Sequence, residues 1–202
     1  MAMEQERLWA IQAQQGDQDA FARIVKAYQR PVYNLAYRML GSAQEAEDAS
    51  QEAFIRVYTR LETYDAGRKL SSWLLSIASH HCIDRLRKRR GQTVSMEDIE
   101  AERWLSDGEP IPEESALDAE RESHVRRLLD TLPEQYRLCI VLRYWHDMSY
   151  DEIAEITSTT QSAVKSRLHR ARKAMAEALY EDSVAAPLAA PMPRRSQDNV
   201  LP

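Results

Sequence analysis

Two basic segments are the parts of this 202-residue chain whose residue types and spacing point most directly to chemistry. The first places five cations within six residues: Arg85, Arg87, Lys88, Arg89 and Arg90. The second, residues 161–175, holds five basic side chains and no acidic one. Stabilising the end of a helix requires fewer cations than this, whereas a polyanion attracts all of them. Both segments therefore indicate contact with nucleic acid or another polyanion.

The overall charge of the chain argues against nucleic-acid binding, but the distribution of that charge along the sequence does not. The chain carries a net charge of −5, and an acidic protein surface is repelled by DNA. Residues 91–123, however, hold 11 acidic and only 2 basic side chains. The excess of negative charge is thus confined to one stretch, which reads as a linker between two units that each contain a basic segment.

Patterns typical of enzymes are missing. The chain has only five glycines, none close enough to another to form a phosphate-binding loop, and it has no G-x-S-x-G motif. His80 and Asp84 are four residues apart, as two metal ligands on a helix would be, but no remote cluster supplies the third or fourth ligand that zinc needs. We therefore expect no catalysis, no cofactor and no metal.

The sequence favours a cytoplasmic protein without membrane insertion. Cys82 and Cys139 form no C-x-x-C motif, which suits a reducing compartment. The first residues are too polar for a secretory signal, and the longest apolar run, 138–142, is bounded by arginines.

Helical periodicity organises the first unit. Apolar residues recur from Phe21 to Tyr28, and Pro31 is expected to begin a new helix rather than continue the old one. Ser42 and Glu45 predict a capping box at the start of the next helix. That helix carries one polar stripe, consisting of Glu45, Asp48, Gln51, Glu52 and Arg56. From its spacing the stripe is either a solvated face or a docking face for a charged partner helix.

A short basic loop follows Tyr64 and leads into the helix that ends in the first basic segment. Trp73 lies on the apolar stripe of this helix, so a place in the core is favoured for it. Tyr64 stands at the edge of the loop, where either a structural role or stacking on a single-stranded base fits.

The second unit predicts a helix-turn-helix. One helix stops before Pro133, and the next has an inner face that includes Tyr136, Cys139, Ile140, Leu142 and Trp145. Ser149 and Glu152 predict a capping box, and residues 158–160 form a turn before the last helix. A short helix, a turn of this length and a basic second helix are typical of DNA-binding proteins.

The last helix divides into two faces. Val164, Leu168, Ala171 and Met175 follow the spacing of a buried stripe. The opposite face, which is expected to contact DNA, carries Ser162, Lys165, Ser166, His169, Arg170 and Lys173.

The predicted fold is all-α, with two small helical domains joined by a flexible acidic linker and followed by a disordered tail. The domains span residues 1–92 and 122–180, the linker spans 93–121, and the Ala/Pro-rich tail spans 181–202. A short helix within the linker, around residues 96–105, fits the pattern.

Four motifs in this order resemble the bacterial sigma-70 family. Residues 48–54, Asp-Ala-Ser-Gln-Glu-Ala-Phe, resemble the D-x-x-Q-E-x-F of region 2.2, and residues 132–136, 149–154 and 164–172 resemble region 4. Because no further domain separates the two regions, the resemblance is to the short extracytoplasmic-function (ECF) class.

The resemblance implies a subunit that binds core RNA polymerase, through its β and β′ subunits, and directs it to promoter DNA. The residues implied for core polymerase binding are Asp48, Gln51, Glu52 and Arg56. Those implied for −10 DNA are Tyr64, Asp65, Arg68, Lys69, Ser71, Ser72, His80, Arg85, Arg87 and Lys88. Those implied for −35 DNA are Thr160, Ser162, Lys165, Ser166, His169, Arg170 and Lys173. The acidic linker would run through the polymerase. The resemblance also allows an anti-sigma protein as a partner.

A stand-alone helix-turn-helix regulator is the main alternative. In that case the first unit would serve dimerisation or ligand binding, and the free protein would bind an operator by itself. A sigma factor would instead need core polymerase to recognise its DNA.

Overall fold

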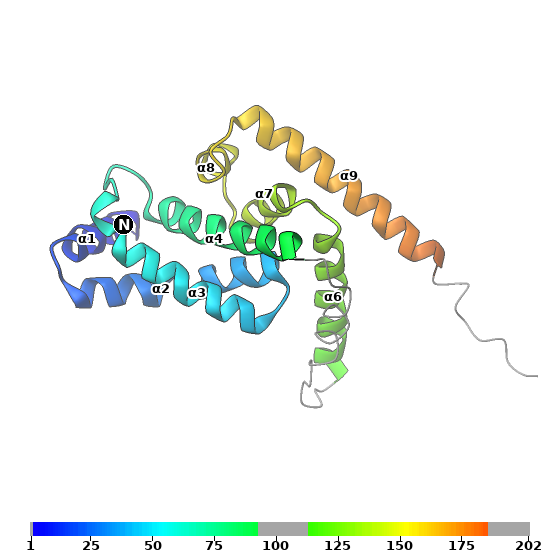
Figure 1. Ribbon diagram of the computed structural model, residues 1–202, viewed down its shortest axis with the longest axis horizontal. Coiled ribbons are helices and arrows are strands. Elements are labelled where there is room, and N and C mark those ends of the chain that lie inside the picture. Colours follow the sequence, from blue (N-terminus) through cyan, green and yellow to red (C-terminus); the bar gives the residue numbers. More distant parts are fainter. Residues whose placement is uncertain (1, 93–112, 186–202) are drawn as a thin grey trace, which may run out of the picture.

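The computed structural model describes residues 2–92 and 113–185, and every regular element in these two ranges is helical (Figure 1). This confirms the all-α class. The helix expected around residues 96–105 lies outside the described residues, as do most of the predicted linker and the end of the predicted tail.

The first unit consists of α1 (Ala2–Gln14), α2 (Gln18–Leu40), α3 (Ala43–Thr59), the 3-10 turn η1 (Leu61–Thr63) and α4 (Leu70–Gln92). The long helix α2 lies against α1, α3 and α4, and it supplies Ile24, Leu35 and Met39 to the core without exposed surface. Asp17 caps α2, and the Ser42 side chain accepts a hydrogen bond from the Glu45 amide at the start of α3. Burial of these apolar stripes, each side chain contributing about 1.5–3 kcal/mol, positions the outer faces of α3 and α4.

The prediction that Pro31 begins a new helix is wrong. Pro31 lies inside α2, which continues without interruption to Leu40. A proline inside a helix removes one backbone hydrogen bond. Here the apolar stripe runs through it, because Ile24, Tyr28, Val32 and Leu35 are all buried, and burial of that stripe keeps the helix continuous.

The second unit consists of α6 (Glu113–Asp130), α7 (Glu134–Trp145), α8 (Tyr150–Ile156) and α9 (Gln161–Ala185). Its helices begin earlier and end later than the predicted domain, because α6 starts inside the expected linker and α9 ends beyond residue 180. Neither glycine nor proline interrupts α6.

Helix α7 is the centre of this unit and is buried on more than the one expected face. Leu138, Val141 and Leu142 are all enclosed. Trp145, expected to face inward, is 37% exposed and lies 4.2 Å below the Arg38 guanidinium of the first unit.

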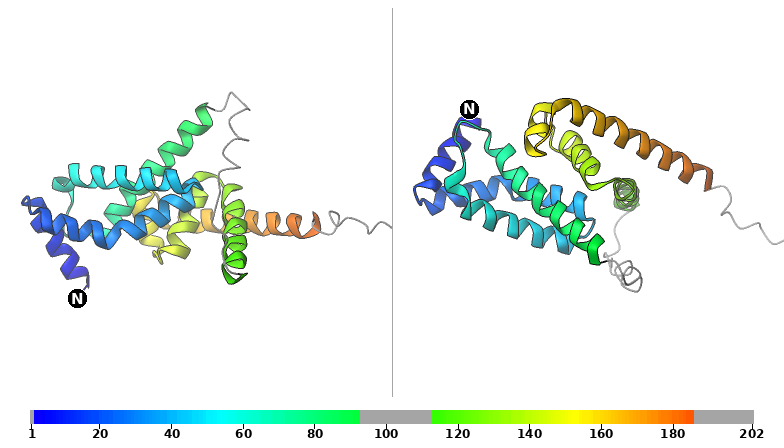
Figure 2. Two further views of the ribbon diagram at one scale, coloured as in Figure 1. Left: turned by 90° about the horizontal axis from the view of Figure 1, so that it is seen from below. Right: turned by 45° about the horizontal axis from the view of Figure 1, so that its top comes forward.

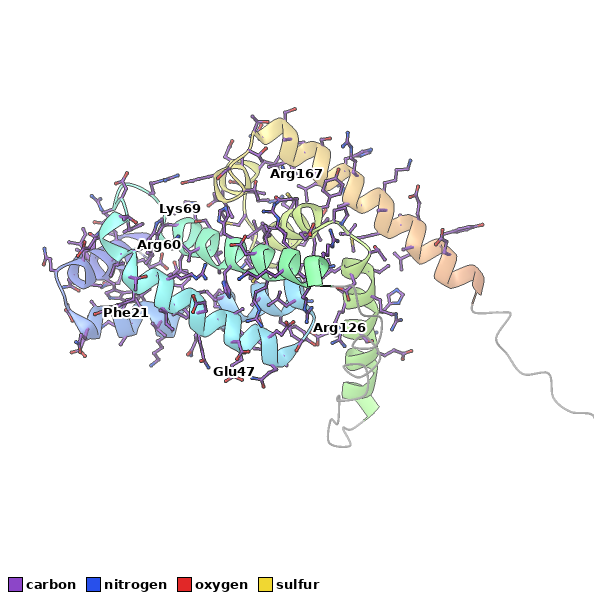
Figure 3. All side chains as sticks on the ribbon, viewed as in Figure 1. Phe21, Glu47, Arg60, Lys69, Arg126 and Arg167 are labelled. Carbon is purple, nitrogen blue, oxygen red and sulfur yellow. The ribbon has the colours of Figure 1, made fainter. Side chains whose placement is uncertain are left out.

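The two units pack against each other around the C-terminal end of α2 (Figure 2). The last carbonyls of a helix have no partner within it. Here the Met39 carbonyl accepts from Arg137 at 2.7 Å, and the Gly41 carbonyl accepts from Arg126 at 2.9 Å (Figure 3). Arg89 of α4 donates to the Leu40 carbonyl at 3.3 Å. Arginines from both units thus cap one helix end.

Candidate nucleic-acid and partner-binding surfaces

Helix α9 separates its side chains into a buried and an exposed face as its sequence predicts. Val164, Leu168 and Ala171 are buried against α7 and α8, and Met175 is partly buried. The predicted contact residues are all exposed: Ser162, Lys165, Ser166, His169, Arg170 and Lys173. A continuous polar and cationic strip therefore faces solvent along α9.

The turn before α9 is held by side-chain caps. Ser149 and Glu152 form the predicted capping box at the start of α8, with Glu152 accepting from the Ser149 amide at 2.8 Å. Thr160 accepts from the Ala163 amide at 3.2 Å and so caps α9. Ser158 adopts φ 50°, a left-handed conformation that reverses the chain between the helices. These contacts fix α8 and α9 in a helix-turn-helix arrangement.

The exposed cations of α9 have different neighbours. Arg170 donates to the Tyr136 hydroxyl at 3.3 Å, an interaction that raises its pKa, and Lys173 lies 3.7 Å from Glu177. Arg167, which the sequence pattern did not single out, is partly buried and reaches Gln135 at 3.4 Å. Arg167 therefore helps to hold α9 on α7 (Figure 3).

The polar stripe of α3 faces solvent, with one apolar residue inside it. Asp48 and Gln51 are exposed, and the Arg56 Nε donates to Glu52 at 2.7 Å, which lowers the pKa of Glu52. Ile55, between them in sequence, is 58% exposed. The sequence pattern did not single out Ile55, although an apolar residue on a charged stripe is a signal for a docking surface.

Glu45 differs from the rest of the stripe because it faces the first unit's own basic helix end. Its carboxylate pairs with Arg89, and one of its oxygens lies 3.5 Å from Arg85. The predicted capping box is therefore only half formed, since the Ser42 side chain caps the helix while Glu45 binds the arginines. Arg87 and Lys88 are exposed.

The loop before α4 is held by its own side chains. Asp65 accepts from the Gly67 amide at 2.8 Å, and the Tyr64 hydroxyl donates to the Arg68 carbonyl at 2.6 Å. Tyr64 is 4% exposed and Ser72 2%, so neither side chain faces solvent, whereas Arg68 and Lys69 do. A cavity of about 200 Å³ opens here, with Tyr64, Arg68, Lys69 and Ser71 in its lining.

A second hollow, of about 450 Å³, lies between α3 and α4. Arg56, Trp73, His80 and Asp84 line it together with Arg60, which the sequence analysis did not assign. Trp73 is only partly buried and packs on Tyr64 with ring centres 5.1 Å apart. The hollow combines cations and an aromatic ring, a combination suited to single-stranded nucleic acid.

The described residues hold no group of three or more metal-ligating side chains. His80 Nδ1 lies 2.6 Å from the Ser76 carbonyl oxygen. Cys82 and Cys139 are buried, and burial raises the pKa of the Cys82 thiol to about 12. Within the part of the chain that the structure describes, no helix is long and apolar enough to cross a membrane.

Comparison with known proteins matches both units to one family. Residues 24–92 match the family model of sigma-70 region 2, and residues 124–175 match that of sigma-70 region 4. The ECF RNA polymerase sigma factor SigW of Bacillus subtilis is 39% identical over 177 residues, covering 84% of this chain and 94% of its own length. The ECF RNA polymerase sigma-E factor of Escherichia coli K12 is 36% identical over 168 residues, covering 80% and 87%.

One solved structure has a similar fold. CnrH, determined in complex with the cytosolic domain of CnrY, aligns with a TM-score of 0.66 at 26% identity and covers 88% of this chain and 99% of its own.

Proposed function

The chain belongs to the ECF class of the sigma-70 family, which acts in promoter-specific transcription initiation, and we propose that it binds core RNA polymerase and directs it to −10 and −35 elements. It has no catalytic activity of its own in this proposal. Residues 1–92 form the region 2 domain and residues 122–180 the region 4 domain.

Core polymerase binds the exposed stripe of α3. Asp48, Gln51, Glu52 and Arg56 meet the β′ subunit, and Ile55 adds apolar contact at the centre of the stripe. This arrangement is supported by the exposure of the stripe and by its mixture of charged residues with one exposed isoleucine.

The −10 element binds the loop before α4 and the hollow beside it. Arg68, Lys69 and Ser71 line the smaller cavity, and Arg60, Trp73 and His80 line the larger one. Asp65 shapes the loop by accepting from the Gly67 amide. Tyr64 and Ser72, being buried, act by holding the loop in shape. Arg85, Arg87 and Lys88 contact phosphates further along α4.

The −35 element binds the exposed face of α9. Ser162, Lys165 and Ser166, near its start, reach base edges, and His169, Arg170 and Lys173 reach phosphates, with Thr160 fixing the helix start. The observation that carries the proposal is the separation of α9 into a buried apolar face and an exposed cationic one behind a capped turn.

In vitro transcription with purified core polymerase tests the proposal. The protein should initiate from specific promoters only together with core enzyme. If no promoter is initiated while the free protein protects an operator, the chain is a stand-alone helix-turn-helix regulator instead.

A protein partner also belongs to the proposal, because CnrH, which has a similar fold, was solved in complex with the cytosolic domain of CnrY. Co-purification of an interacting protein that blocks core binding would support such an anti-sigma partner.

A further inference from the structure

Two carboxylates of α8 bind two cations at the end of the loop before α4, residues 64–69, which is named the −10 loop after its proposed role. The Lys69 Nζ lies 2.7 Å from the Glu152 Oε1, and the Arg68 guanidinium pairs with Glu155 (Figure 3). The hydrogen bond from Lys69 is the largest cause that lowers the pKa of Glu152, to about 2. These contacts join residues more than eighty positions apart in the sequence.

The contact between the two units is also stabilised at three other places. Arg137 and Arg126 cap the end of α2, Arg90 lies 2.8 Å from Glu134, and Arg38 covers the Trp145 ring. The contact between the units is therefore built from specific polar partners along α2 and α4.

This arrangement cannot contact both promoter elements at once. Elements 25 base pairs apart are separated by about 85 Å along B-form DNA. Glu155 touches Arg68 of the loop, and the ten residues from Glu155 to Lys165 span at most about 36 Å even when fully extended. The units must separate before the loop and α9 can each bind their element.

Resting on the proposed role of the loop, we propose that α8 is an internal ligand of the −10 loop, with the Glu152 and Glu155 carboxylates occupying Arg68 and Lys69 in place of DNA phosphates. The α3 stripe stays exposed in this closed arrangement, so core polymerase can bind first. Arg68 and Lys69 lose their carboxylate partners, and become fully available to DNA, only when the units separate.

The two ion pairs between the loop and α8 are weak enough to be broken. Arg68 and Lys69 keep 54% and 51% of their side-chain surface exposed, and pairs of this kind contribute little each and are screened by salt. The apparent affinity for DNA rises in proportion to the open fraction, so a small decrease in a dominant closed population has a large effect.

The first test removes the two charges and preserves the cap. The double variant E152Q/E155Q has neither carboxylate. The side-chain oxygen of a glutamine at residue 152 can still accept the hydrogen bond of the capping box. At 50 mM salt, the full-length variant should bind a fluorescent mixed-sequence 12-nucleotide single strand about three- to tenfold more tightly than the wild type. The matched control is E47Q with E120Q, which changes the net charge equally at exposed residues away from α8. Equal affinity of the two double variants overturns the inference.

The second test measures the arrangement itself. Spin labels at D151C and E62C, two exposed positions, report the separation of α8 and the loop by pulsed electron paramagnetic resonance, while native Cys82 and Cys139 are buried. E155R should lengthen the distance, and R68E added to it should restore the short one. A distance unchanged by E155R, or not restored by R68E, overturns the inference. Because transcription by the wild type with core enzyme is measured separately, failure of the proposed sigma function gives a different result.

Discussion

Replacing Arg137 with methionine tests how much the contact between the two units contributes to stability. Arg137 is only 6% exposed, and its guanidinium donates to the Met39 carbonyl at 2.7 Å and to Asp130 at 2.8 Å. Burial lowers the pKa of Arg137, and Asp130 offsets part of this effect.

The expected cost comes mainly from the Met39 carbonyl. Methionine fills a similar volume but donates no hydrogen bond, and a buried acceptor left without a partner costs about 1–3 kcal/mol. Asp130 adds little, because its side chain is 53% exposed and becomes solvated. We therefore expect R137M to lower the free energy of unfolding by about 1–3 kcal/mol.

Urea denaturation followed by circular dichroism measures this difference. R172M is the matched control, since Arg172 is exposed, and surface changes of this kind stay within about 0.5 kcal/mol. If R137M falls within the same range as the control, then Arg137 does not hold the two units together in solution, and the reasoning from the capped end of α2 is refuted.

Three further predictions concern binding and pH. D48K with E52K should abolish binding to core polymerase without loss of helical content, whereas E47K should not; unchanged affinity in biolayer interferometry would contradict the assigned docking face. R170A should weaken DNA binding evenly across −35 variants and lower the salt slope by about one, because the Arg170 guanidinium is held by Tyr136 away from the start of α9; a loss confined to one base pair would show instead that it reads a base. The pKa of His146 is lowered to about 4, chiefly by burial, so the unfolded chain binds the proton first, and stability should fall as the pH drops from about 6.5 to about 4. The pH profile of the free energy of unfolding for H146Q should lack this part of the decline.

Local sequence patterns predicted those features that depend on neighbouring residues. The Ser149–Glu152 capping box and the two faces of α9 follow from spacing alone and are confirmed. The interruption at Pro31 was predicted by the same local reasoning and is wrong, because the packing of α2 on three other helices outweighs one missing hydrogen bond.

Features that depend on contacts between residues far apart in the sequence could not be predicted from the sequence. Trp145 fits an inward stripe, but its ring lies against Arg38, a residue more than one hundred positions away. Glu45 fits a capping box, but two arginines of α4 bind its carboxylate. A periodic pattern states which face of a helix is apolar and does not state which distant cation will meet a given carboxylate.

Under the proposed function, the internal pairing of cations weakens the attraction of the closed chain, whose net charge is −5, for DNA. A cation that already has a carboxylate partner gains less from a phosphate, because the first pair must be broken. Arg68, Lys69 and Arg85 each have such a partner in the described arrangement. On α9, Lys165 lies over the Tyr150 ring and Arg170 contacts the Tyr136 hydroxyl, neither of them a carboxylate, and Lys173 lies 3.7 Å from Glu177 of the same helix. Under the proposed function, α9 therefore attracts a duplex in the closed arrangement more readily than the −10 loop does, and the loop binds its element after the units separate.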